Sequence, residues 1–253
     1  MTTFAAPRAR MTAQGFRTLT ATQARLLLRA PAALIWLAFP LLMLIAFGSI
    51  PGFRTADADL GGRSVLDVYV PTIAAMVPLF LGCTALPMTM ADHREKGFLR
   101  RLSVSPVPAE GMLAALLAVI AVLAAAGVGV ITAVGGLAYH VKAPADPGAV
   151  AAAFLLGTTA VLSLGLVAAA LARTSAAAAG MGVPLMVLNF FFSGLYVPLS
   201  ELPRALRQIS EYVPFGAVMA AWDGRGALWQ HLAVLAAYTV VGSLLAARLF
   251  RWE

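Results

Sequence analysis

A dense group of charged and apolar residues occupies positions 94–106, between two long apolar stretches of the chain. It reads Arg-Glu-Lys-Gly-Phe-Leu-Arg-Arg-Leu-Ser-Val-Ser-Pro, in a sequence that is 61% hydrophobic and only 11% charged. On a short helix, Phe98, Leu99 and Leu102 would project together with charged residues around them. An apolar knob with a charged rim is what a docking helix offers to a groove on a partner. The pattern therefore indicates a surface that binds a partner protein. The alternative is a solvated basic loop.

The sequence contains little that could carry out catalysis. Its only two lysines are followed by Gly97 and Ala143, so no Gly-Lys-Ser/Thr phosphate-binding loop is present. The chain cannot be a P-loop ATPase by itself. Three scattered histidines, His93, His140 and His231, lack the spacing of a metal site, and we expect no metal and no cofactor on this chain.

Three polar residues lie within the apolar stretches or at their ends. Ser193 and His231 could be imagined as the pair of an intramembrane serine protease, but Ser193 lacks a preceding Gly-x pattern. Asn189 is the strongest polar group at depth. It could line a pathway, but a hydrogen bond between helices is the commoner role of such a residue. Because the apolar stretches lack Asp, Glu, Lys and Arg apart from positions at their ends, such as Arg248, a proton-coupled transporter is disfavoured.

The apolar stretches define the fold class. Runs of about 20 apolar residues can cross a bilayer as helices, and continuous runs of this length favour helices over a barrel. We therefore expect an all-α membrane protein forming a single transmembrane domain over 1–253. A further amphipathic helix is predicted at 11–29, in the membrane interface. The six predicted spans are 32–50, 69–91, 111–138, 150–172, 180–199 and 230–250.

The net charge of +7 could suggest nucleic-acid binding, but the distribution of the charges argues against it. The N-terminus, 92–110, 172–179 and the C-terminus would share one side of the membrane and hold 12 of the 18 basic residues. The same segments hold 4 of the 11 acidic residues, which leaves that side at +8 and the other at −1. The positive-inside rule then predicts both termini and the 92–110 segment in the cytoplasm, facing anionic lipid.

The segment 195–215, between the last two spans, is predicted to lie at the outer surface. Within it, residues 202–213 place Leu202, Leu206, Ile209 and Val213 on one helical face, and Pro214 would close the helix. A pair of short broken helices that dips into the outer leaflet fits this pattern. A simple surface helix fits it equally well.

Taken in order, these features resemble the membrane subunit of type-2 ATP-binding-cassette (ABC) exporters. That family carries Glu, Gly, a basic-Leu pair and Ser-Pro in a cytoplasmic segment after its second span. It also carries small residues and Pro-Leu after its fifth span, followed by an outer helix. The matching positions here are Glu95, Gly97, Arg101-Leu102, Ser105-Pro106, Ser193-Gly194, Pro198-Leu199, Pro203 and Pro214.

The resemblance implies a bacterial plasma-membrane permease for amphipathic drug-like or lipid-like compounds, and among its subgroups it is most similar to drug-resistance exporters. It also implies two ABC ATPase subunits that carry the ATP and Mg²⁺, and a second permease copy or a paralogue. Export of a polysaccharide or lipid-linked glycan, and a non-transporting assembly or sensor subunit, remain alternatives. The expected ATPase-docking residues are Arg94, Glu95, Gly97, Phe98, Leu99, Arg101, Leu102, Ser105 and Pro106, and the expected outer-gate residues are Pro198, Pro203, Leu206, Ile209 and Pro214.

Overall fold

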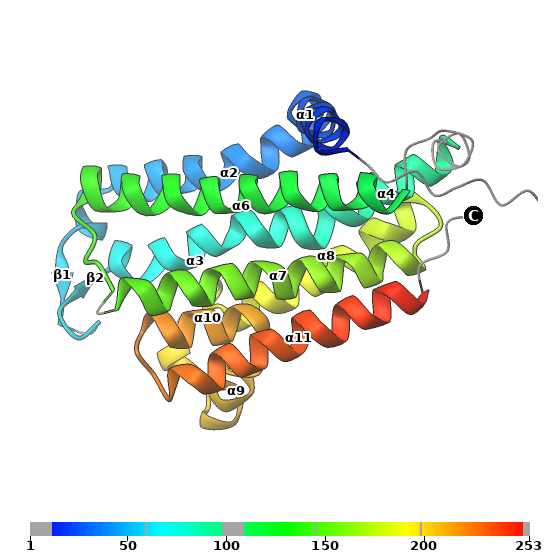
Figure 1. Cartoon of the computed structure of the whole chain (residues 1–253). Helices are drawn as coiled ribbons and strands as arrows, with labels where there is room; N and C mark the ends of the chain where they lie inside the picture. Colours follow the sequence, from blue (N-terminus) through cyan, green and yellow to red (C-terminus); the bar gives the residue numbers. More distant parts are fainter. Residues whose placement is uncertain (1–11, 59, 98–108, 145, 198, 250–253) are drawn as a thin grey trace, which may run out of the picture.

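The computed structural model describes residues 12–58, 60–97, 109–144, 146–197 and 199–249, and these form a bundle of long helices. Most of the helices run along one common direction (Figure 1). The long ones are α1 (Ala13–Arg29), α2 (Pro31–Ser49), α3 (Val65–Phe80), α4 (Leu86–Glu95), α6 (Ala109–Tyr139), α7 (Pro147–Leu171), α8 (Ser175–Phe192) and α11 (Leu228–Leu249). Shorter elements are η1 (Pro51–Phe53), β1 (Ala56–Asp57), β2 (Arg63–Ser64), η2 (Leu81–Ala85), η3 (Leu199–Glu201), α9 (Arg204–Ser210) and α10 (Pro214–Trp222).

Five helical segments are long and apolar enough to cross a membrane. They are Val65–Glu95, Glu110–Tyr139, Pro147–Leu171, Ser175–Phe192 and Leu228–Leu249. A sixth candidate is formed by α1 and α2 taken as one bent pair, with an angle of 63° between them. The predicted all-helical, multi-pass membrane architecture is therefore confirmed. The predicted boundaries differ most for the span expected at 180–199, which begins at Ser175 and ends at Phe192.

The bend between α1 and α2 follows from local sequence. Pro31 is the first residue of α2 and fixes its own φ angle. A residue before proline is pushed out of the helical region, and Ala30 is extended, with φ −76° and ψ 119°. The helix predicted at 11–29 is thus present as α1. Leu27 is buried in the core, whereas Leu26 is exposed, so only part of the predicted apolar face is covered by the chain itself.

The span from α3 to α4 lies at the centre of the bundle. Its most apolar stretch is 83% buried within the chain, whereas the corresponding stretch of α11 is only 17% buried. Midway along it, η2 forms a wider π-helical turn, in which the N–H of Leu86 bonds to the carbonyl of Leu81. Pro87 follows directly and has no N–H to donate to the carbonyl of Cys83. Single π turns of this kind are often found at functional sites.

Two glycines on neighbouring helices fit against this π turn. A Cβ added to Gly165 on α7 would lie 1.9 Å from the carbonyl oxygen of Gly82. A Cβ added to Gly182 on α8 would lie 1.8 Å from the carbonyl oxygen of Cys83. Small residues allow such backbone approach between membrane helices. The position of α7 and α8 against the central span therefore depends on these two glycines.

At the end of the bundle where α3 begins, the side chain of Asp67 joins several segments. It forms a capping box with Ser64 at the start of α3, in which Ser64 N–H donates to Oδ2 over 2.8 Å. Its Oδ1 accepts from the N–H of Lys142 over 2.8 Å, and Lys142 Nζ donates to the carbonyl of Gly62. These bonds hold the β1–β2 hairpin against the α6–α7 connection. In Figure 1 the hairpin lies at the other end of the bundle from the end of α4.

We predict that Gly182→Ala destabilises the protein, because the new methyl group must displace the Cys83 backbone. Overpacking of a tight core costs typically about 1–3 kcal/mol. Gly180→Ala is a matched control on the same helix, since an added Cβ there meets nothing within 4 Å. The measurement is thermal unfolding of the purified protein in detergent. Equal unfolding temperatures for the two variants would contradict the packing described here.

Candidate functional site: the end of α4

Glu95, the last residue of α4, binds the start of α8. Its Oε1 accepts a hydrogen bond from the Ser175 N–H over 3.0 Å, and its Oε2 accepts one from Ser175 Oγ over 3.2 Å. The first N–H groups of a helix have no partner within the helix itself. Thr174 already accepts from Ala177 as the N-cap of α8, so Glu95 satisfies a donor that this cap leaves open.

Arg94, the neighbouring residue, binds the end of α7. Its Nη1 donates to the carbonyl oxygen of Ala172 over 2.8 Å and also to that of Ala169. The last carbonyl groups of a helix lack intrahelical donors. Arg94 therefore caps free carbonyl groups at the end of α7, as Glu95 caps a free N–H group at the start of α8.

The signs of the two charges match the helices that they contact. A helix carries a partial negative charge at its C-terminal end and a partial positive charge at its N-terminal start. The Arg94 guanidinium contacts the negative C-terminal end of α7. The Glu95 carboxylate contacts the positive N-terminal start of α8. We call Arg94, Glu95 and their partners Ala169, Ala172 and Ser175 the α4 clamp. It ties three spans together at one end of the bundle.

Gly97 ends the described part of this segment. Its φ of +63° lies in the left-handed region, and an added Cβ would meet nothing within 4 Å. Its N–H bonds to the carbonyl of Arg94, which closes the helix with a glycine C-cap. Of the predicted docking residues, Arg94, Glu95 and Gly97 thus lie together at the end of α4. Phe98, Leu99, Arg101, Leu102, Ser105 and Pro106 lie outside the described residues.

The predicted outer helix is present but is shorter than expected. We expected one helix over 202–213, closed by Pro214. Instead α9 begins after Pro203 and ends at Ser210, and Pro214 is the first residue of a second helix, α10. Proline is favoured at that position because the first N–H groups of a helix are unpaired anyway. Pro198 lies outside the described residues.

The apolar face of the outer helix is only partly covered by the chain. Leu202 is buried and Leu206 is half-buried, but Ile209 is 49% exposed. The helix that follows is different, because α10 is buried from Pro214 to Ala220. It packs against α7, α8 and α11. Two short helices are thus present here, and the second one, α10, lies inside the bundle. That the segment 195–215 dips into the outer leaflet stays a prediction.

Asn189 connects α8 to this buried helix. Its Nδ2 donates to the carbonyl of Leu185 over 2.9 Å, and its Oδ1 accepts from the Phe215 N–H over 3.3 Å. The side chain is buried and acts as a cap for α10. The helix–helix interpretation of Asn189 is thus the one that its contacts support, and lining of a pathway stays a prediction.

The imagined serine–histidine pair is not formed. Ser193 Oγ donates to the carbonyl of Phe190, and His231 Nε2 bonds to the carbonyl of Arg225 over 2.6 Å. Each group is therefore engaged with a backbone partner. In the described ranges of the chain, no three His, Cys, Asp or Glu residues are grouped closely enough to hold a metal ion.

Comparison with protein-family models gives a match to the ABC-2 type transporter family over residues 14–222. The match covers most of the chain, from α1 to the end of α10. The protein belongs to the ABC-2 type transporter family. A search of curated proteins finds no match. The membership and the apolar helices together define a multi-pass transmembrane permease of the ABC exporter class, a class that is generally not catalytic itself.

We predict that Glu95→Ala destabilises this permease by about 1 kcal/mol, the usual effect of losing a helix-capping side chain. Glu95→Gln keeps an oxygen that can accept from Ser175 and should lose less. Thermal unfolding of both variants measures the difference. If the alanine variant were as stable as the unchanged protein, the clamp would contribute nothing to holding α8.

Proposed function

We propose that this permease exports its substrate with energy from two separate ABC ATPase subunits, which dock on residues 94–106 and on the N-terminal helix. ATP and Mg²⁺ are bound by those partners. The observation that carries the proposal is the α4 clamp, because the segment that meets the partner also binds α7 and α8 directly. A push on this segment therefore acts on three spans together.

We assign the docking end to the cytoplasm because the segments at that end carry a positive net charge. In Figure 1 the end of α4 and the α7–α8 turn lie at one end of the bundle, and α1 lies above α6, toward that end. In sequence, the segments at this end, together with the C-terminal residues, carry a net charge of +8, against −1 for the rest. Basic residues accumulate on the cytoplasmic side of membrane proteins. Both termini are accordingly assigned to the cytoplasm of a bacterial plasma membrane.

Coupling proceeds by rigid-body motion of packed helices. Closure of the ATPases moves the end of α4, and Glu95 carries the start of α8 with it. Near the C-terminal end of α8, Asn189 holds α10 through its hydrogen bond with the Phe215 N–H. Movement of α8 thereby reaches the 195–215 segment, which serves as the outer gate.

The transported compound is amphipathic, drug-like or lipid-like, and self-protection against an antibiotic is the role that we assign. Support comes from the spans, whose apolar faces carry few ionisable groups. Exposed apolar side chains such as Leu34, Phe39 and Leu42 on α2 and Val240 and Leu244 on α11 face away from the core. A second copy of the chain or a paralogue completes the pathway.

The docking role is tested at Gly97. Gly97→Trp adds a large side chain outside the bilayer, so the protein should insert normally but lose most stimulation of ATP hydrolysis in a reconstituted complex. Gly97→Asn is the matched control, because asparagine tolerates the left-handed backbone. Unchanged stimulation with tryptophan would remove the docking role. Absence of stimulation by the unchanged protein would favour a non-transporting subunit.

The outer gate is tested at Leu206. Leu206→Glu places a carboxylate on the half-buried face of α9, at a cost of about 1–3 kcal/mol, and should disturb transport or make the complex leak. Ala205→Glu puts the same group on the exposed side of the helix and should behave like the unchanged protein. Stimulation of the ATPase should persist in both. Normal, tight transport by the Leu206 variant would leave α9 as a passive surface helix.

The orientation is tested by labelling single cysteines in a Cys83→Ser background, in intact cells with an impermeant thiol reagent. Asp57→Cys lies on the exposed β1 strand and should be labelled from outside. Lys96→Cys lies at the end of α4 and should react only after the cells are opened. The reverse pattern would invert the topology.

A further inference from the structure

A cavity of about 360 Å³ opens at the hairpin end of the bundle, away from the α4 clamp. It lies between the β1–β2 hairpin, the first half of α3, the residues after α8, and the α9–α10 region. Three arginines and one aspartate are the charged groups in its lining: Arg63, Arg207, Arg225 and Asp223. The lining therefore carries a net formal charge of +2, on a side of the protein that is otherwise slightly acidic.

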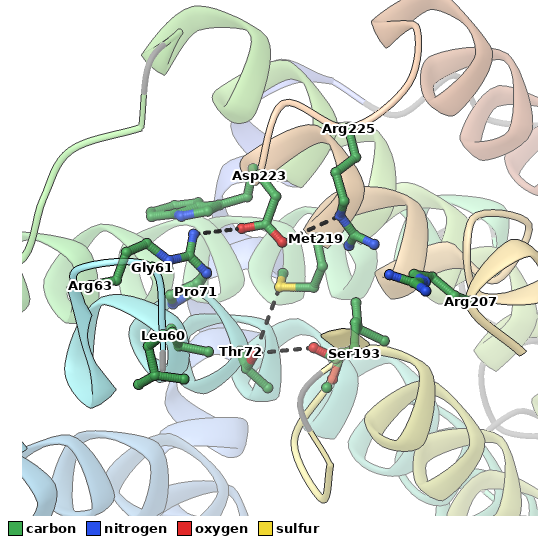
Figure 2. Close-up of a pocket in the computed structure, with 14 residues that line it drawn as sticks. Leu60, Gly61, Arg63, Pro71, Thr72, Ser193, Arg207, Met219, Asp223 and Arg225 are labelled. Atoms are coloured by element: carbon green, nitrogen blue, oxygen red, sulfur yellow. Dashed lines mark hydrogen bonds and ion pairs between the residues drawn. The ribbon is translucent and has the colours of Figure 1, made fainter. Parts of the chain in front are cut away.

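Only part of this positive charge is balanced by the chain. Asp223 accepts from Arg63 Nη1 over 3.0 Å and pairs with Arg225 Nε over 3.4 Å, so one carboxylate serves two guanidiniums. Arg207 forms no side-chain hydrogen bond or ion pair with any part of the chain that the structure describes. Figure 2 shows the carboxylate between Arg63 and Arg225, with the Arg207 guanidinium beyond Arg225, on the side away from Arg63.

Arg225 has donors that are left open. Its Nη2 and Nε are buried and have no hydrogen-bond partner among the described residues, although Nε lies 3.4 Å from the Asp223 carboxylate. A buried donor without an acceptor is costly, and buried polar groups in proteins almost always find a partner. An anion in the cavity would supply acceptors to Arg225 and a counter-charge to Arg207 together.

A second, apolar cavity of about 400 Å³ adjoins this one. Leu60 and Val68 line both, and the remainder of the second lining is apolar or aromatic: Met43, Phe47, Phe53, Val65, Tyr69 and Leu195. A cationic cavity next to an apolar one suits a molecule with an anionic head and a hydrocarbon chain. Guanidinium groups match phosphate in geometry and in charge.

We propose that the arginine cavity binds a phosphate group, with Arg207 and Arg225 as its principal ligands. The apolar neighbour favours the phosphate of a phospholipid, with an acyl chain against Phe47 and Tyr69, over free inorganic phosphate. The site is separate from the docking end of the permease. Its test needs no ATPase, so it can fail without affecting the proposed function.

The experiment follows thermal unfolding of the full chain in neutral detergent during titration with three probes. They are dioleoylphosphatidylglycerol, dioleoylglycerol as its phosphate-free counterpart, and inorganic phosphate at constant ionic strength. A ligand that binds only the folded state raises the unfolding temperature with its concentration. We expect stabilisation by the phospholipid and none by dioleoylglycerol.

Arg207→Gln should weaken phospholipid binding by about tenfold, as expected for loss of a charge-assisted hydrogen bond. Arg204→Gln, three residues earlier on α9, removes the same charge from an exposed position outside the cavity and should leave binding unchanged. Arg207→Lys keeps the charge and should retain part of the affinity.

Stabilisation by inorganic phosphate that is lost in Arg207→Gln and retained in Arg204→Gln would also support the site, with free phosphate as its source. The proposal is overturned if neither phosphate probe stabilises the protein, or if dioleoylglycerol stabilises it equally. It is also overturned if the Arg204 and Arg207 variants lose affinity equally.

Discussion

The arrangement of the bundle depends on a close approach of three backbones at the middle of its central span. The π turn at Leu81–Ala85 presents the carbonyl groups of Gly82 and Cys83 sideways, and Gly165 and Gly182 leave room for them. Lipid supplies no hydrophobic force between helices, so association rests on packing and on interhelical hydrogen bonds. Any larger residue at either glycine would separate α7 or α8 from the central span.

The α4 clamp is a second attachment between the same three spans. Because α7 and α8 are held to the central span both at its middle and at its end, they cannot easily move independently of it. α8 is also bound to α10 through Asn189. The central span, α8 and α10 thus form a connected series from one end of the bundle into the other. In the proposed exporter, this series conveys movement from the ATPase to the outer segment.

Much of this architecture could be predicted from sequence, because hydropathy alone locates apolar helices. The spans, the α1 helix and the unusual character of residues 94–106 all follow from local patterns. The roles of Arg94 and Glu95 could not be predicted in this way, because their partners lie 75 to 80 residues further along the chain. Charged residues at a helix end would fit a solvated surface equally well until α7 and α8 are placed beside them.

The buried helix α10 was missed for a different reason. Its nine residues are too few to cross a bilayer, and Pro214 was interpreted as the end of one helix when it is the start of another. The apolar run after that proline was the available signal. The π turn was not predicted either. Pro87 indicates a disturbed helix, but the close packing of Gly165 and Gly182 against the turn is seen only in the folded chain.

The central claim is that the end of α4 and the α7–α8 turn move as one unit when ATP binds to the partner subunits. The direct measurement is the distance between spin labels at Lys96→Cys and Arg173→Cys in a Cys83→Ser background, with labelled chains diluted into unlabelled ones. We predict the same distance with and without ATP when Glu95 is present, and a nucleotide-dependent distance in Glu95→Ala. A distance that changes with ATP while Glu95 is present, or that never changes in either protein, would contradict the account.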